Sequence, residues 1–117
     1  MTMSLHNSDF DINDLDIRQF PGTGLEINFG SGTIDQLTIS DAGANALVAS
    51  NAKVDLSNAS LYNVKGTAIK ATSLEASSFT NLDIQNCYRA FQAIESNLSS
   101  DIVSIQEVEE GLSLIHI

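Results

Sequence analysis

Positions 56–71 read LSNASLYNVKGTAIKA, and the same order of apolar and polar residues recurs about every 22 positions along the chain. Each position keeps its character rather than its identity, so the repeat is best seen in columns. One column is apolar throughout and contains Met3, Leu25, Leu47, Ile69, Phe91 and Leu112. Two residues later, a second apolar column contains Leu5, Ile27, Ala49, Ala71, Ala93 and Leu114. Mostly polar residues separate the two columns, and this alternation predicts a short strand with one buried face.

Two further alternations complete each repeat. The stronger one has Leu15, Leu37, Ala59, Leu82 and Val103 in its first column, and Ile17, Ile39, Leu61, Ile84 and Ile105 in its second. A weaker one lies between the other two, as at Phe10 and Ile12 or at Val54 and Leu56. One such unit cannot cover its own apolar side chains, so it must stack on its neighbours, and about three repeats are needed for stability.

The repeat therefore predicts an all-β fold, a parallel β-helix (a solenoid) of about five coils with three short strands in each coil. We expect residues 1–117 to form a single domain without an obvious cap at either end. Because uncapped ends leave strand edges unpaired, we expect isolated chains to associate end to end as homo-oligomers.

The turn between the second and third strands has a polar corner in each coil. Its residues are Asp14, Gln36, Asn58 and Asn81. Asn tolerates the left-handed backbone conformation, and stacked amides can hydrogen-bond along the helix axis. We therefore interpret Asn58 and Asn81 as structural. The turns at 21–24 and 41–44 contain glycine, which we expect to supply positive φ.

The fourth coil departs from the regular spacing. One extra residue near Ser77 and Ser78 delays the following apolar positions and predicts a β-bulge. Cys87 then falls in the column of Ala42 and Val64, so we expect a buried thiol that serves packing. It is the single Cys, which rules out an internal disulfide.

Composition limits the classes of function. The 117 residues carry a formal net charge of −10 and contain 43% hydrophobic but only 6% aromatic residues. A chain this acidic repels a phosphate backbone, so direct binding to nucleic acid is not expected. No apolar run approaches the length of a membrane span, and residues 1–7 lack the basic and apolar parts of a signal peptide.

The segment LSNASLYNVKGTAI at 56–69 resembles the repeats of right-handed parallel β-helix proteins in the pectate-lyase-like superfamily, and residues 79–91 echo it. This resemblance implies a fold that is shared by polysaccharide lyases, glycoside hydrolases, phage tailspikes and adhesins. Residues 54–63 are also similar to pentapeptide-repeat sequence, although the period of five covers only part of each coil. Residues 112–117, LSLIHI, resemble the translated mosaic-end adapter of transposon-based sequencing libraries, which gives the hypothesis of a non-native tail.

Few residues in the sequence have the spacing of a catalytic or metal-binding motif. The spacing of the acids is not that of a calcium-binding loop, and His6 and His116 lack partners for a triad or a metal site. Paired carboxylates at the spacing of a glycosidase are not found either. We expect no catalytic, cofactor-binding or metal-binding residues. If one face holds a ligand, we expect the outward column of the first strand, with Glu26, Lys70 and Gln92.

Three functions follow as hypotheses. The leading one is a non-catalytic structural or binding section of a larger β-helical protein, adhesin-like or tailspike-like. It would be secreted or displayed on a cell or phage surface and would hold polysaccharide or a cell-surface glycan. The second is an acidic, pentapeptide-repeat-like interaction protein that mimics DNA and occludes a DNA-binding partner. The third is a fragment of a polysaccharide lyase or glycoside hydrolase whose catalytic coils are missing.

Overall fold

A computed structural model describes the backbone of residues 3–96 and 98–115, and the side chains of residues 3–19 and 21–96. The described backbone forms one eight-stranded sheet in which all neighbouring strands are parallel. The strands are β1 (Met3–His6), β2 (Asp9–Phe20), β3 (Leu25–Asn28), β4 (Ser31–Ala42), β5 (Leu47–Ser50), β6 (Lys53–Thr72), β7 (Ser77–Ile94) and β8 (Leu98–Ile115).

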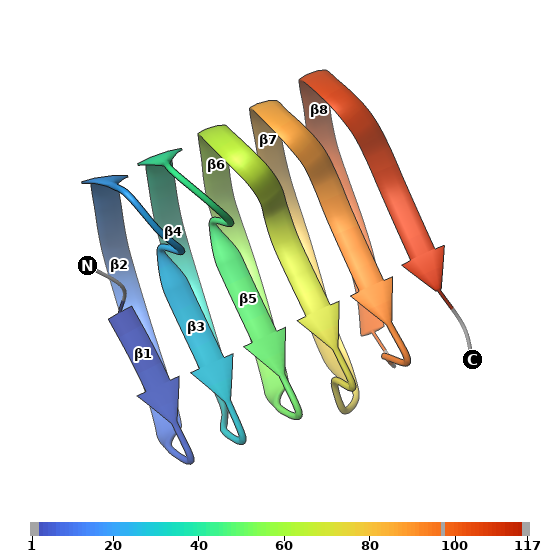
Figure 1. The fold of residues 1–117 in the computed structure, drawn as a ribbon. Coiled ribbons are helices and arrows are strands. Elements are labelled where there is room, and N and C mark those ends of the chain that lie inside the picture. The colour runs from blue at the N-terminus through green and yellow to red at the C-terminus, as the bar shows by residue number, and fades with distance from the viewer. Residues whose placement is uncertain (1–2, 97, 116–117) are drawn as a thin grey trace.

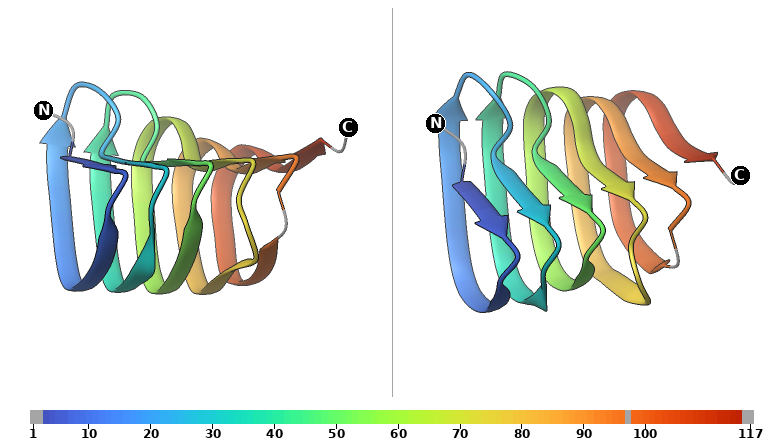
Figure 2. Two further views of the ribbon diagram at one scale, coloured as in Figure 1. Left: turned by 90° about the horizontal axis from the view of Figure 1, so that it is seen from below. Right: turned by 60° about the horizontal axis from the view of Figure 1, so that its bottom comes forward.

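The strands wind into a right-handed coil, as predicted. In Figure 1 the short strands β1, β3 and β5 run downward at the front, the chain returns upward behind them, and it advances from left to right. Figure 2 shows the coils stacked side by side with the two ends of the chain at opposite ends of the stack. Residues 3–96 make about four turns, and β8 continues the stack. The parallel β-helix is therefore confirmed.

Matching apolar residues form continuous internal columns. Leu25 pairs with Leu47, and Leu47 pairs with Ile69, at a constant step along the sequence. All three side chains are fully buried, and Phe91 continues their column. The core is thus a set of aliphatic and aromatic columns parallel to the helix axis, as the repeat predicted.

The second and third strands of each coil are not separate elements. β2 and β4 each span 12 residues and bend at Asp14 and Gln36, where φ is 64° and 62°. A single residue in the left-handed region turns the chain, and the hydrogen-bond pattern resumes on both sides of it. The prediction of three short strands located the three sides of each coil but not their continuity, since two sides form one strand in β2 and β4 and all three sides form one strand in β6, β7 and β8.

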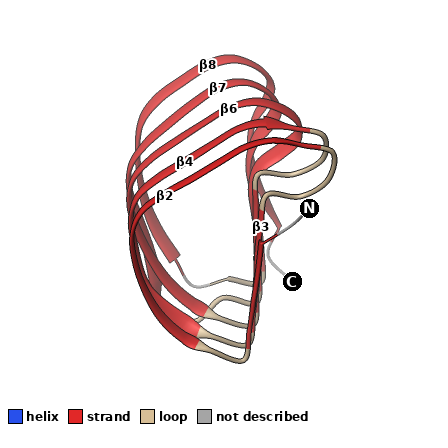
Figure 3. Ribbon diagram, turned by 90° about the vertical axis from the view of Figure 1, so that its left-hand side faces the viewer, coloured by secondary structure: helices blue, strands red, loops and turns tan. Residues whose placement is uncertain are grey.

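Three corners with positive φ shape the cross-section of the coil, which Figure 3 shows in a view along the axis. The first corner has Asn7, Phe29, Asn51, Ser73 and Glu95, the second has Asp14, Gln36, Asn58 and Asn81, and the third has Gln19, Asp41, Asn63 and Asn86.

None of the described glycines has positive φ, so the expectation that glycine supplies it at the turns is wrong. Glycine is needed for a different reason, namely close approach between coils. A Cβ on Gly43 would overlap the carbonyl oxygen of Pro21, and one on Gly32 would overlap the carbonyl oxygen of Phe10.

The predicted bulge of the fourth coil is present. The backbone N–H of Glu75 donates to the carbonyl of Ala52 at 2.9 Å, which keeps the regular step, whereas Phe79 pairs with Leu56 one residue later than that step. The extra residue therefore lies between Glu75 and Ser78, where Ala76 and Ser77 together oppose Val54, which agrees with the predicted position. The Ser77 hydroxyl fills the gap, because it accepts the buried N–H of Val54 at 2.9 Å and donates to the Glu75 carbonyl at 2.6 Å.

A second register shift, between Val64 and Thr67, restores the original step. In β8 the partner of Leu82 is Ile102 rather than the expected Val103, because the register shifts on both sides of Leu82.

Cys87 pairs with Val64 and Val108 in the predicted column and is 4% exposed. Burial raises the pKa of the Cys87 thiol above its ordinary value.

Candidate ligand-binding groove

The predicted ligand face is assembled as expected. Glu26, Val48, Lys70 and Gln92 are successive partners in neighbouring coils, so Glu26, Lys70 and Gln92 lie in one column. All of these side chains are half-buried, and Val48 separates Glu26 from Lys70. The structure thus brings the three residues onto one face, and a ligand on that face stays a prediction.

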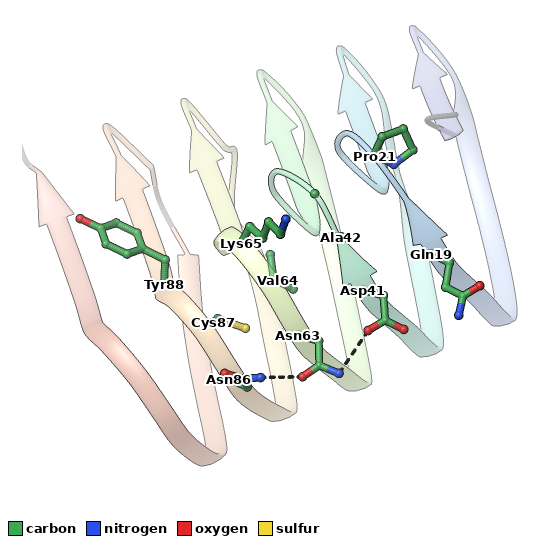
Figure 4. A pocket seen from close by; sticks show the side chains of 11 residues that line it. Gln19, Pro21, Asp41, Ala42, Asn63, Val64, Lys65, Asn86, Cys87 and Tyr88 are labelled. Carbon is green, nitrogen blue, oxygen red and sulfur yellow. Dashed lines mark hydrogen bonds between the residues drawn. The ribbon is translucent and has the colours of Figure 1, made fainter.

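A groove of about 850 Å³ lies elsewhere, at the third corner of the coil, beside the turns that lead to the next short strand. Figure 4 shows it from close by. Its lining residues are Gln19, Pro21, Asp41, Ala42, Gly43, Asn63, Val64, Lys65, Asn86, Cys87 and Tyr88. The groove extends over successive coils, because the lining set repeats at the period of the helix.

One side of the groove is a row of polar side chains from the third corner, called here the amide row: Gln19, Asp41, Asn63 and Asn86. The Asn86 Nδ2 donates to Asn63 Oδ1 at 2.7 Å, and the Asn63 Nδ2 donates to Asp41 Oδ1 at 3.2 Å. Figure 4 shows these three side chains in line along the axis. All four residues have positive φ, and the hydrogen bonds orient the side chains of Asp41, Asn63 and Asn86.

Sequence reasoning found the second corner and missed this one. Asn81 Nδ2 donates to Asn58 Oδ1 at 3.0 Å, which confirms the predicted stacking of amides there. The amide row also recurs in the sequence. Each of its residues directly precedes an inward residue of the column that contains Ala42, Val64 and Cys87, as Asn63 precedes Val64. That recurrence of short polar residues before a core position could have located the third corner.

The opposite side of the groove carries Pro21, Lys65 and Tyr88. Lys65 falls at the second register shift, and such irregularities redirect side chains away from the regular face of a sheet. Tyr88 is 45% exposed although it is a large ring, and the Arg89 guanidinium carbon lies 5.6 Å from its centroid. An exposed aromatic ring beside a polar row is an arrangement suited to a ligand with both apolar and hydroxyl-bearing surfaces.

The amide row keeps part of its hydrogen-bonding capacity. A primary amide has two N–H donors and two acceptor lone pairs. Asn63 uses one donor on Asp41 and accepts one bond from Asn86, so a donor and an acceptor remain for another partner. Asp41 is the one carboxylate among the described residues that line the groove. Hydrolysis by a glycosidase uses a pair of carboxyl groups, and the described residues that line the groove supply one.

A smaller hollow of about 220 Å³ lies on the neighbouring outward face and is lined by Ser60, Tyr62, Asp83 and Gln85. On the same face Arg18 makes an exposed bidentate ion pair with Asp16, the shortest distance being 2.7 Å. This hydrogen bond lowers the pKa of the Asp16 carboxyl.

The remaining predicted groups contribute no site. His6 packs edge-on against Phe29 with ring centroids 6.1 Å apart, and His116 lies outside the described residues. Within the described ranges, no three or more His, Cys, Asp or Glu side chains are placed to hold a metal ion. The described part of the chain also has no helix long and apolar enough to span a membrane. Comparisons with protein-family models, with curated proteins and with solved structures each found no match.

Proposed function

We propose that the chain is a non-catalytic section of a β-helical rod and that its groove holds a neutral polysaccharide running along the helix axis. The observation that carries this proposal is the amide row, a set of oriented hydrogen-bonding groups repeated once per coil along one wall of the groove. Neighbouring coils of a parallel sheet are about 4.8 Å apart. A regular array of this kind is suited to a ligand that is itself a regular chain of similar units.

Pre-organisation supports binding at this wall. Asn63 and Asn86 are already held by their neighbours, so a ligand loses little affinity to the ordering of side chains. Sugar hydroxyls both donate and accept hydrogen bonds, which matches the mixed capacity left on the amides. Tyr88 provides an exposed ring on the other side, against which the apolar face of a sugar can pack.

Charge selects among polysaccharides. The charges of Asp41 and Lys65 cancel among the groove-lining residues, whereas the whole chain carries a net charge of −10. A uronate or sulfated polymer would be repelled by that field, and a neutral chain would not. As wider context we propose a secreted or surface-displayed protein, because stiff solenoids with lateral glycan sites suit that setting.

The test is a screen of neutral and acidic oligosaccharides, followed by isothermal titration with the best neutral one. We expect Lys65→Ala and Tyr88→Ala each to weaken binding about tenfold, since each removes a group from the groove wall. Lys70→Ala and Gln92→Ala on the first-strand face serve as matched controls and should leave binding unchanged. If the controls lose affinity and the groove variants do not, the ligand lies on the first-strand face. Release of new reducing ends would contradict a non-catalytic role.

A further inference from the structure

We propose that one flat side of the coil pairs with the same side of a second copy of this chain, with the two rods antiparallel and Val48 at the twofold axis. This side is the first-strand face, which is formed by residues 3–6, 25–28, 47–50, 69–72 and 91–94. None of the described residues that line the groove belongs to this face, so the inference does not rest on the proposed function.

The first-strand face is flat. It consists of β1, β3, β5 and the C-terminal parts of β6 and β7, which pair in parallel and in constant register. In its view along the axis, Figure 3 shows this side as straight where β3 is labelled, whereas the side that contains β2 and β4 is bowed. Two sheets can pack face to face about 10 Å apart when their side chains interdigitate. The first-strand face is therefore shaped to lie against another sheet.

The first-strand face carries no net charge, although the chain is strongly acidic. Among the described residues, its outward side chains include one acid, Glu26, and one base, Lys70, whereas the whole chain has a net charge of −10. Asn28, Val48 and Ser50 lie beside them and are half-buried. Depletion of charged residues around an apolar centre is typical of protein–protein interfaces. Two copies can therefore bring these faces together without the repulsion between like-charged surfaces.

The two charges are placed symmetrically about Val48. Glu26 and Lys70 are the partners of Val48 in the coils before and after it, so they lie two coil steps, or about 10 Å, apart. Neither side chain makes an ion pair with another described residue. A twofold axis that passes through Val48 along the strand reverses the order of the coils in the second copy. It therefore brings Glu26 of each copy against Lys70 of the other, which gives two ion pairs across one self-complementary interface.

Other arrangements of two copies are less favourable. Parallel packing of the rods would oppose Glu26 to Glu26 and Lys70 to Lys70, and like charges directly opposite each other are destabilising. Shifting the antiparallel arrangement by one coil would oppose Lys70 to Val48 and leave both charges without a partner. With the axis at Val48, the two valine side chains meet at the centre and the short Ser50 side chains meet beside them.

The size of the first-strand face sets the strength of the association. Strands of four residues at about 3.3 Å per residue, over five coils about 4.8 Å apart, cover about 300 Å². Stable complexes bury about 800 Å² on each partner. The described part of the face should therefore hold a weak dimer, which forms near millimolar concentration and dissociates at micromolar concentration.

Reversal of the two charges tests the proposal. Sedimentation equilibrium from micromolar to millimolar concentration, at physiological ionic strength, measures the dissociation constant of the dimer. We expect Glu26→Lys and Lys70→Glu each to weaken dimerisation about tenfold, because each makes both symmetry-related pairs like-charged. The variant that combines the two substitutions should regain the affinity of the unmodified chain, since the exchanged charges face each other again. Glu75→Lys and Lys53→Glu make the same changes in net charge at exposed positions off the face and should leave dimerisation unchanged.

A second measurement needs no substitution and so does not depend on the folding of a variant. In a mixture of isotope-labelled and unlabelled chains, a filtered nuclear Overhauser spectrum reports only contacts between copies. It should show a contact between the Val48 methyl groups of two copies. Circular dichroism of each variant verifies that the fold is retained.

Several results would overturn the inference. Monomers of the unmodified chain at millimolar concentration would exclude the dimer, and dimers without a contact between copies at Val48 would place the interface on another face. A folded combined variant that stays dissociated would exclude the antiparallel pairing of Glu26 with Lys70. Absence of dimers, together with oligosaccharide binding that Lys70→Glu weakens, would mean that the first-strand face holds a glycan.

Discussion

Replacement of Asn63 tests whether the corners of the coil are set by residue chemistry. Asn63 has a φ of 55°, donates one side-chain hydrogen bond at 3.2 Å and accepts another at 2.7 Å. Each exposed bond of this kind contributes about 0.5 kcal/mol, at the low end of measured values. Loss of the left-handed tolerance of Asn adds about 1 kcal/mol when the new residue has a Cβ. Asn63→Ala should therefore lower the free energy of unfolding by about 2 kcal/mol.

Asn63→Gly separates the two contributions. It loses the same two hydrogen bonds, but glycine adopts positive φ without steric strain. We expect Asn63→Gly to lower the free energy of unfolding by about 1 kcal/mol. The Gly variant should therefore be more stable than the Ala variant by about 1 kcal/mol. Urea denaturation followed by circular dichroism, with a common m value, measures both variants.

Ser60 provides the matched control, because it lies within β6 and has no positive φ. In the interior of a strand glycine is destabilising by about 0.5–1 kcal/mol relative to Ala, so the order of the two variants should reverse there. The same order at Asn63 and Ser60 would refute the claim that the corner requires a left-handed residue.

Three further outcomes are expected. Ile69→Ala should lower the free energy of unfolding by about 2–5 kcal/mol in chemical denaturation, because the side chain is fully buried, whereas Lys70→Ala on the outward face should change it by less than about 0.5 kcal/mol. Ser77→Ala should cost about 1–3 kcal/mol in the same assay, since it leaves the buried N–H of Val54 without an acceptor. Burial raises the pKa of Cys87, so the folded state holds its proton more tightly than the unfolded chain. The resulting stabilisation is complete below about pH 8.5, where an unfolded thiol is protonated, and is lost as pH rises through the folded pKa. Cys87→Val should remove this part of the pH dependence in thermal melts from pH 7 to about pH 10.

The sequence predicted the architecture because stacking imposes the same requirement on every coil. The column through Leu25, Leu47 and Ile69 can be read directly, since only apolar residues are accepted at its inward positions. The delay of Phe79 and Cys87 was visible for the same reason. In β8 the expectation of Val103 was wrong, because Ile102 and Val103 are adjacent and equally apolar, and the sequence alone does not choose between them.

The groove could not be predicted in the same way. Its shape depends on the path of the turn after Ala42 and of the register shift after Val64, and residue spacing does not encode that path. The use of glycine was also misjudged. Gly43 was expected to supply a special φ, whereas it is required by the nearness of Pro21 in the preceding coil. Such a contact between coils becomes visible only when the register is known.

Nuclear Overhauser effects between methyl groups of neighbouring coils test the stacking most directly. The account predicts a strong contact between Leu47 and Ile69, whose Cα positions are in register, and another between Leu61 and Ile84, one residue further apart in sequence because of the bulge. Contacts of Ile69 confined to residues three and four positions away, as in a helix, or an antiparallel pattern of contacts, would contradict it.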